Sequence, residues 1–234
     1  MGEKNRNLTD GPVMRSMILF AVPMIAGNLL QQCYNIADTF IVGRYLGTNA
    51  LAAVGSSFTL MTFLTSILIG LCMGSGAVFF IRFGEKDERG LKEALYASFF
   101  LILGITLCLN ILVYCFLDGI NVFLTVPGEV WLDMRQYLVV VFMGITATFL
   151  YNFFSSLLRA LGNSVVPLYF LAISTILNIG LDLWFVIGLE RGVTGAAEAT
   201  SSMSCLTVCH NCDRFKTLKR NALTRESKNY TKRG

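Results

Sequence analysis

Residues 16–43 read SMILFAVPMIAGNLLQQCYNIADTFIVG, and this stretch decides the class of the fold. It contains no charged residue before Asp38, and its apolar residues form a continuous block with no helical or alternating period. A helix that crosses a membrane needs about 20 mostly apolar residues. The block is too long for the apolar part of a secretory signal, and no small-residue cleavage site follows it. We therefore predict a retained membrane-spanning helix over about Met17–Val42.

Similar apolar blocks recur along the chain. They cover about residues 50–81, 94–117, 136–158 and 165–189. A sixth block begins at Val193 and loses its apolar character after Thr200. The chain is 54% hydrophobic and 15% charged, whereas a soluble domain carries roughly 25% charged residues. We predict an all-α, polytopic membrane helical bundle in contact with membrane lipid, with five transmembrane helices and an incomplete sixth.

The basic residues of the short connections predict the orientation in the membrane. Lys and Arg are enriched in cytoplasmic connections. The N-terminal segment, the connection at 82–93 and Arg159 together hold eight such residues, and the connections on the opposite side hold three. We therefore expect the N-terminus in the cytoplasm.

Residues 201–234 differ in character from the rest of the chain. They contain eight Lys or Arg residues and two acidic residues, so the formal charge of +4 comes from this segment. A CHNC sequence at 209–212 is half of a zinc-ribbon pattern, and the second half is missing. We expect a membrane lobe at 1–200 and a basic, disordered tail at 201–234. Because the apolar character ends abruptly, we hypothesise that a frameshift or a truncation produced the tail.

The sequence of the predicted membrane part lacks the residues of common catalytic sites. The one histidine, His210, lies in the tail, so a Ser-His-Asp triad is excluded from the spans. No GxxxxGK[ST] phosphate-binding loop occurs, so ATP is not expected to supply energy. We predict a protein that is not an enzyme, needs no cofactor and binds no nucleic acid.

Two acidic residues within the predicted spans indicate a binding site. A central Asp costs about 2.5 to 3.5 kcal/mol on insertion, so such residues usually face a cavity and line an ion or proton path. Asp38 and Asp182 lie roughly 9 and 12 Å from the same membrane face, and Asn178 precedes Asp182 by one helical turn. These groups suit Na⁺ or a shared proton equally. Alternatively, Asp38 contacts lipid headgroups and Asp182 pairs with Arg191.

Pro23 interrupts the first predicted span. Proline removes a backbone hydrogen bond from a helix interior and bends the helix. We expect a kink at Pro23, which would make the first helix, with its acid at Asp38, a moving part.

Several segments in order resemble the MATE (multidrug and toxic compound extrusion) transporters of prokaryotic type, over about residues 14–200. They are FAVPMIAGNLLQQCYNIADTFIVGRYLG at 20–47, LAAVGSS at 51–57, GLCMGSGAVFFIRFGEKD at 70–87, LLRALGNSVVP at 157–167, LNIGLDLWFVIG at 177–188 and GVTGAAEAT at 192–200. The resemblance implies the N-terminal lobe of a twelve-helix fold in the bacterial plasma (inner) membrane. It also implies efflux of organic cations and amphipathic drugs by antiport against Na⁺ or H⁺.

The resemblance assigns roles to particular residues. The implied cation or proton site comprises Asp38, Asn178, Asp182 and Thr200. Two polar residues of the fourth predicted span, Tyr137 and Asn152, are implied to line the substrate cavity. Asn152 lies near the inner end of that span, so its depth argues against a place in the cation site.

The resemblance ends before the second lobe of such transporters. Alternating access needs two lobes, so the expected partners are a drug substrate and the missing C-terminal lobe. One alternative is a non-transporting membrane fragment. Another is a lipid or polysaccharide-precursor flippase of the same superfamily, which would need cationic residues in its cavity. We expect no Lys or Arg within a span, which favours drug efflux.

Overall fold

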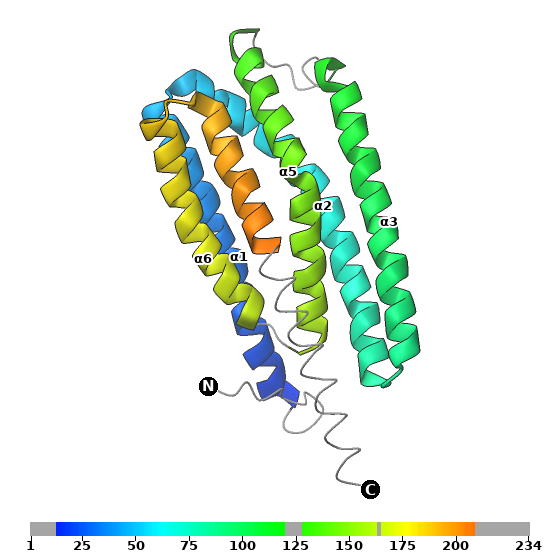
Figure 1. The fold of residues 1–234 in the computed structure, drawn as a ribbon. Coiled ribbons are helices and arrows are strands. Elements are labelled where there is room, and N and C mark those ends of the chain that lie inside the picture. Colours follow the sequence, from blue (N-terminus) through cyan, green and yellow to red (C-terminus); the bar gives the residue numbers. More distant parts are fainter. Residues whose placement is uncertain (1–12, 120–127, 163–164, 209–234) are drawn as a thin grey trace, which may run out of the picture.

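The computed structural model describes residues 13–119, 128–162 and 165–208, and nearly all of them are helical (Figure 1). No strand occurs in these ranges, so the predicted all-α bundle is confirmed. The labelled elements are α1 (Val13–Tyr45), α2 (Thr48–Gly84), α3 (Glu88–Cys115), α5 (Gly128–Ala160), α6 (Val165–Leu183) and the short π-helix η1 (Trp184–Gly188). A further helix spans residues 192–208 and is orange in Figure 1.

Four helices of the described chain are long and apolar enough to cross a membrane. They are α2, α3, the Val130–Ala160 part of α5, and α6 together with η1. These four coincide with the second to fifth predicted spans. The first predicted span forms the continuous helix α1, which runs through Pro23 and is not one of the four.

Large apolar side chains face outward on several helices. Leu29, Phe63 and Ile176 are 62%, 65% and 72% exposed. Extensive exposed apolar surface marks contact with a membrane or a protein partner.

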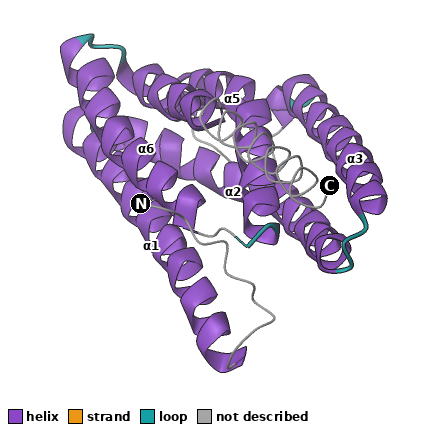
Figure 2. Ribbon diagram, turned by 60° about the horizontal axis from the view of Figure 1, so that its bottom comes forward, coloured by secondary structure: helices purple, strands orange, loops and turns teal. Residues whose placement is uncertain are grey.

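The helices form two groups that the 192–208 helix joins. α2 packs along α5 with α3 against both, whereas α1 packs along α6. In Figure 2, α1 and α3 lie on opposite sides of the bundle. The 192–208 helix lies between α6 and α5 (Figure 1). Its Thr200 shares a 2.9 Å hydrogen bond with the Tyr34 hydroxyl of α1, and Ser201 donates to the Val140 carbonyl of α5 at 3.2 Å.

The 192–208 helix corrects the prediction that the sixth helix fails after Thr200. The helix continues for two further turns, and its hydroxyl side chains are satisfied there by bonds to its own backbone carbonyls. Ser204 donates to the Thr200 carbonyl at 3.1 Å, and Thr207 donates to the Met203 carbonyl at 2.7 Å. At 1.5 Å per residue this helix is about 25 Å long, shorter than the about 30 Å hydrocarbon layer. Residues 209–234, with the CHNC sequence, lie outside the described residues.

Two apolar cores hold the bundle. The first lies among α2, α3 and α5, where Phe79 and Phe149 both pack on Phe153 with ring centroids 5.8 and 5.9 Å apart. The second joins α1, α2 and α5 to the 192–208 helix, whose Ala196 and Ala197 are fully buried. These small side chains let that helix approach its neighbours closely.

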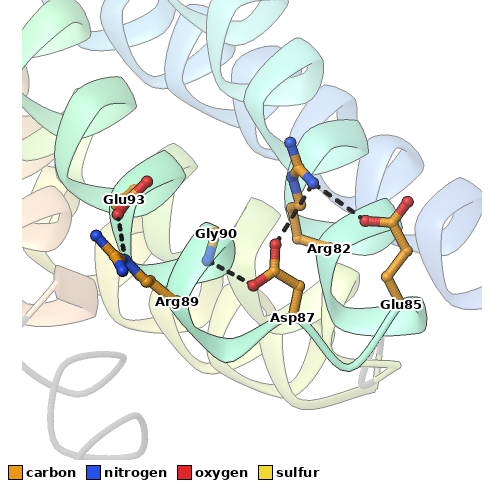
Figure 3. Close-up of polar contacts among 6 residues, drawn as sticks. All are labelled: Arg82, Glu85, Asp87, Arg89, Gly90 and Glu93. Atoms are coloured by element: carbon orange, nitrogen blue, oxygen red, sulfur yellow. Dashed lines mark hydrogen bonds and ion pairs between the residues drawn. The ribbon is translucent and has the colours of Figure 1, made fainter.

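The connection between α2 and α3 neutralises several of its own charges (Figure 3). Arg82 pairs with Glu85 at 3.2 Å and with Asp87 at 3.4 Å. Asp87 also caps α3, because its Oδ1 accepts a hydrogen bond from the Gly90 amide at 2.9 Å. The turn therefore begins α3 with a side-chain cap and leaves few of its charges unpaired.

Candidate functional site

Three of the predicted site residues come together as buried, unpaired polar groups. Asp38 of α1 is 7% exposed, and Asn178 and Asp182 of α6 are 3% and 0% exposed. Within the described chain, one oxygen of Asp38, both amide atoms of Asn178 and both oxygens of Asp182 have no hydrogen-bond partner. Asp182 lies within electrostatic range of Asp38. Buried polar atoms without partners are costly, so each needs a partner such as a water, a proton or an ion.

The spacing of polar residues along α6 produces this arrangement. Thr175, Asn178 and Asp182 are buried, whereas Ile176, Leu177 and Leu183 between and beside them are exposed. Residues three or four apart share one face of a helix. α6 therefore turns a polar face towards the interior and an apolar face outward, the reverse of a helix in a soluble protein.

Two tyrosines and Thr200 surround the carboxyl pair. Thr200 donates its hydroxyl hydrogen to the Ala196 carbonyl at 3.1 Å, so Tyr34 is the donor in the 2.9 Å bond between Tyr34 and Thr200. Tyr34 and the buried Tyr137 both lie within electrostatic range of Asp38 and Asp182. Thr200 and Tyr137 were predicted site residues, whereas Tyr34 was not. Its position one turn before Asp38, on the same helix face, was the available signal.

The alternative placements of the two acids are wrong. Asp38 is buried, so its side chain does not contact lipid headgroups. Arg191 forms its ion pair with Glu198, not with Asp182. Both acids are therefore held in the interior of the bundle.

A cavity of about 170 Å³ lies among α1, α2, α5 and α6, apart from the carboxyl pair. Asn152 and Pro23 line it together with Arg159. Tyr137 and Asn152 are separated by fifteen residues of α5, which is about 22 Å of helix. The two residues implied to line one substrate cavity therefore lie in different places, and the depth argument that kept Asn152 away from the acids is supported.

Arg159 lies just beyond the predicted fourth span but lines a cavity between the helices. It belongs to the last turn of α5, which extends past the apolar block at 136–158. Its side chain is half-buried and lines the 170 Å³ cavity. A cavity cation is therefore present, so a flippase is not disfavoured on that ground.

The donor atoms of the site differ from those of a typical metal centre. Among the described residues, no group of three or more His, Cys, Asp or Glu side chains is placed to hold a metal ion. The buried set is a carboxyl pair with neutral amide and hydroxyl groups. Two carboxyl groups can be offset by one or two monovalent cations or protons.

Comparison with known proteins identifies the family. The sequence profile of the MatE family matches residues 23–184. The chain belongs to the MatE family. It is 34% identical over 194 residues to the "Probable multidrug resistance protein YoeA" and 30% identical over 197 residues to the "Probable multidrug resistance protein YpnP", both of Bacillus subtilis. These alignments cover 80% and 84% of this chain but 42% and 44% of the relatives.

The fold agrees with solved MATE transporters. A structure described as "Crystal structure of MATE in the bent conformation" matches with a TM-score of 0.84 and 26% sequence identity. The match covers 94% of this chain and 49% of that one. The chain thus has the fold of one half of a MATE transporter and spans less than half the length of its curated relatives. It is a membrane protein, and the family resemblance seen in the sequence is confirmed.

Proposed function

We propose that this chain supplies the cation-binding lobe of a multidrug efflux antiporter. The main support is the group of buried polar atoms without hydrogen-bond partners on Asp38, Asn178 and Asp182. An apolar bundle keeps such atoms unpaired only at a cost of about 1–3 kcal/mol each. A ligand that binds there and leaves again explains why they persist.

The proposed ligand is Na⁺ or H⁺. Hard cations prefer oxygen ligands, and the carboxyl groups of Asp38 and Asp182 supply them together with the Asn178 amide. Tyr34 and Thr200 offer hydroxyl oxygens nearby. A proton on either carboxyl would relieve the same repulsion between the two acids.

α1 connects the proposed cation site to the 170 Å³ cavity. Asp38 lies at one end of this helix, and Pro23, fifteen residues earlier, lines the cavity of about 170 Å³. A proline inside a helix leaves a backbone carbonyl unpaired and allows bending there. In the proposal, cation binding at Asp38 shifts α1 about Pro23 and so alters the cavity wall.

Export would require a second lobe facing this one. The relatives named multidrug resistance proteins are more than twice as long as the matched segment. In the proposal, a C-terminal lobe or a second copy of this chain provides the opposite wall of the drug pathway. Organic cations and amphipathic drugs are the proposed substrates, exported from the cytoplasm with this lobe in the plasma membrane.

Ethidium accumulation tests the proposal in cells that produce the chain. We expect lower accumulation than in cells without it, and we expect an imposed inward Na⁺ or H⁺ gradient to strengthen the effect. Asp38→Asn should abolish it, whereas the exposed Asp118→Asn should not. Unchanged accumulation with the normal chain would instead support a non-transporting membrane fragment.

A flippase for anionic lipid precursors is the second candidate, favoured by one observation. Arg159 places a positive charge in the 170 Å³ cavity, where an anionic headgroup would be recognised. Translocation of a fluorescent anionic lipid that Arg159→Gln abolishes, with no effect of the chain on ethidium, would select this candidate.

A further inference from the structure

Arg159 is a half-buried cation without an acidic partner. Its Nε donates to the Ser155 carbonyl at 3.1 Å, which is one turn away on the same helix. It forms no ion pair with any residue in the described part of the chain, whereas Arg82, Arg89 and Arg191 all do. A desolvated charge is costly unless a counter-charge is supplied. An anion from outside the chain would supply it.

The cavity wall around Arg159 suits an anion. The lining includes the amides of Asn28, Gln31 and Asn152, and no described lining residue is acidic. Asn152 uses its amide nitrogen once, donating to the Thr148 carbonyl at 2.8 Å, so a second N–H remains. A guanidinium group with neighbouring N–H donors is the usual means of holding phosphate or carboxylate.

The size of the cavity and the rest of its lining indicate which kind of anion binds. Drug-sized ligands occupy pockets of about 300–1,000 Å³, so a cavity of about 170 Å³ holds a headgroup and not a whole drug. Much of the remaining lining is apolar, and Met73 in it is 54% exposed. The apolar lining residues are Met24, Ile69, Met73, Leu168 and Leu171. A molecule with an anionic headgroup and an acyl chain fits this mixed polar and apolar lining.

We infer that Arg159 and the amides around it bind the phosphate group of an anionic membrane lipid. Arg159 lies on the side expected to be cytoplasmic, where basic pockets between membrane helices hold anionic headgroups. This site is separate from the carboxyl pair: Tyr137 and Asn152, one beside each, are about 22 Å apart along α5. The inference stands whether or not the chain exports drugs.

Lipid-dependent thermal unfolding of the purified chain in detergent tests this inference. Phosphatidylglycerol should raise the unfolding temperature of the normal chain, and phosphatidylcholine at the same concentration should not. Arg159→Gln should weaken the apparent affinity for phosphatidylglycerol about tenfold, the effect of one charge-assisted bond. Arg159→Lys should retain most of the affinity for phosphatidylglycerol. Arg135→Gln, which changes an exposed arginine of the same helix, should behave as the normal chain.

Two results would overturn the inference. One is equal stabilisation of the normal chain and Arg159→Gln by phosphatidylglycerol. The other is equal stabilisation by phosphatidylglycerol and phosphatidylcholine, since this would show that the chain does not recognise the charge of the headgroup. Glycerol phosphate added at matched ionic strength distinguishes the source of the phosphate. If it competes with the lipid only at far higher concentration, the acyl chain contributes as proposed. If it binds as well as the lipid, the lipid is the wrong source.

Discussion

Replacing Gly144 with alanine tests whether the 192–208 helix is seated inside the bundle. A Cβ added at Gly144 of α5 would lie 2.6 Å from the Ser201 Oγ, 2.9 Å from its Cβ and 3.2 Å from its Cα. Only the hydroxyl could rotate away, so one helix would have to move. Overpacking of this kind costs about 1–3 kcal/mol. Alanine is about 1 kcal/mol more favourable than glycine inside a helix. We therefore expect Gly144→Ala to lower the free energy of unfolding by up to about 2 kcal/mol, and to be about 1–3 kcal/mol worse than the same change at an uncrowded glycine.

The contact can be isolated with a second substitution and a control. Ser201→Gly removes the two closest atoms, although glycine in a helix costs about 1 kcal/mol itself. In a double-mutant cycle, Gly144→Ala should therefore cost less when Ser201 is glycine. Gly104→Ala on α3 is the control, because an added Cβ there meets nothing within 4 Å. It should leave stability unchanged or slightly raised.

Unfolding in mixed micelles with increasing dodecyl sulfate, followed by circular dichroism, measures these free energies. The seating of the 192–208 helix against α5 is refuted if Gly144→Ala costs no more than Gly104→Ala. A coupling energy of zero between Gly144 and Ser201 would refute it as well.

Three further predictions follow from contacts in the structure. Asp87→Ala should destabilise the chain by about 1 kcal/mol through loss of the cap on Gly90, measured by the same unfolding assay; no change would show that the cap is not formed. Tyr34→Phe and Thr200→Ala should each lower the free energy of unfolding by about 0.5–1.5 kcal/mol. The double variant should lose less than the sum of the two, because both substitutions remove the same hydrogen bond. Strictly additive losses would show that this bond is not formed. Asp182→Leu should raise stability by about 1–3 kcal/mol in Na⁺-free buffer, because two buried oxygens without partners are removed; a large loss of stability would mean that Asp182 has a structural partner.

The sequence predicted the helical spans and the acid pair for simple physical reasons. Long apolar blocks leave few alternatives to membrane helices, and an acid inside such a block must turn inward. Asp38 and Asp182 could therefore be placed together from depth alone. Tyr34 was missed because a tyrosine in an apolar block reads equally well as lipid-facing or buried.

Other features depend on contacts that the sequence pattern does not reveal. Apolar continuity predicted an end at Thr200, but the helix continues and the hydroxyls of Ser204 and Thr207 are satisfied by its own carbonyls. Tyr137 and Asn152 were placed in one cavity, although the length of α5 separates them. The cavity beside Arg159 could not be predicted, because its lining comes from α1, α2 and α6 as well as from α5.

Infrared difference spectroscopy of the chain in lipid vesicles tests the central claim most directly. Spectra would be recorded on adding Na⁺ at constant pH, and then on changing the pH at constant Na⁺. The proposed cation site predicts a carboxyl band that responds to at least one ion, disappears in Asp38→Asn and in Asp182→Asn, and persists in Asp118→Asn. A spectrum in which no carboxyl band responds to Na⁺ or H⁺, or in which the responding band survives both site substitutions, would contradict it.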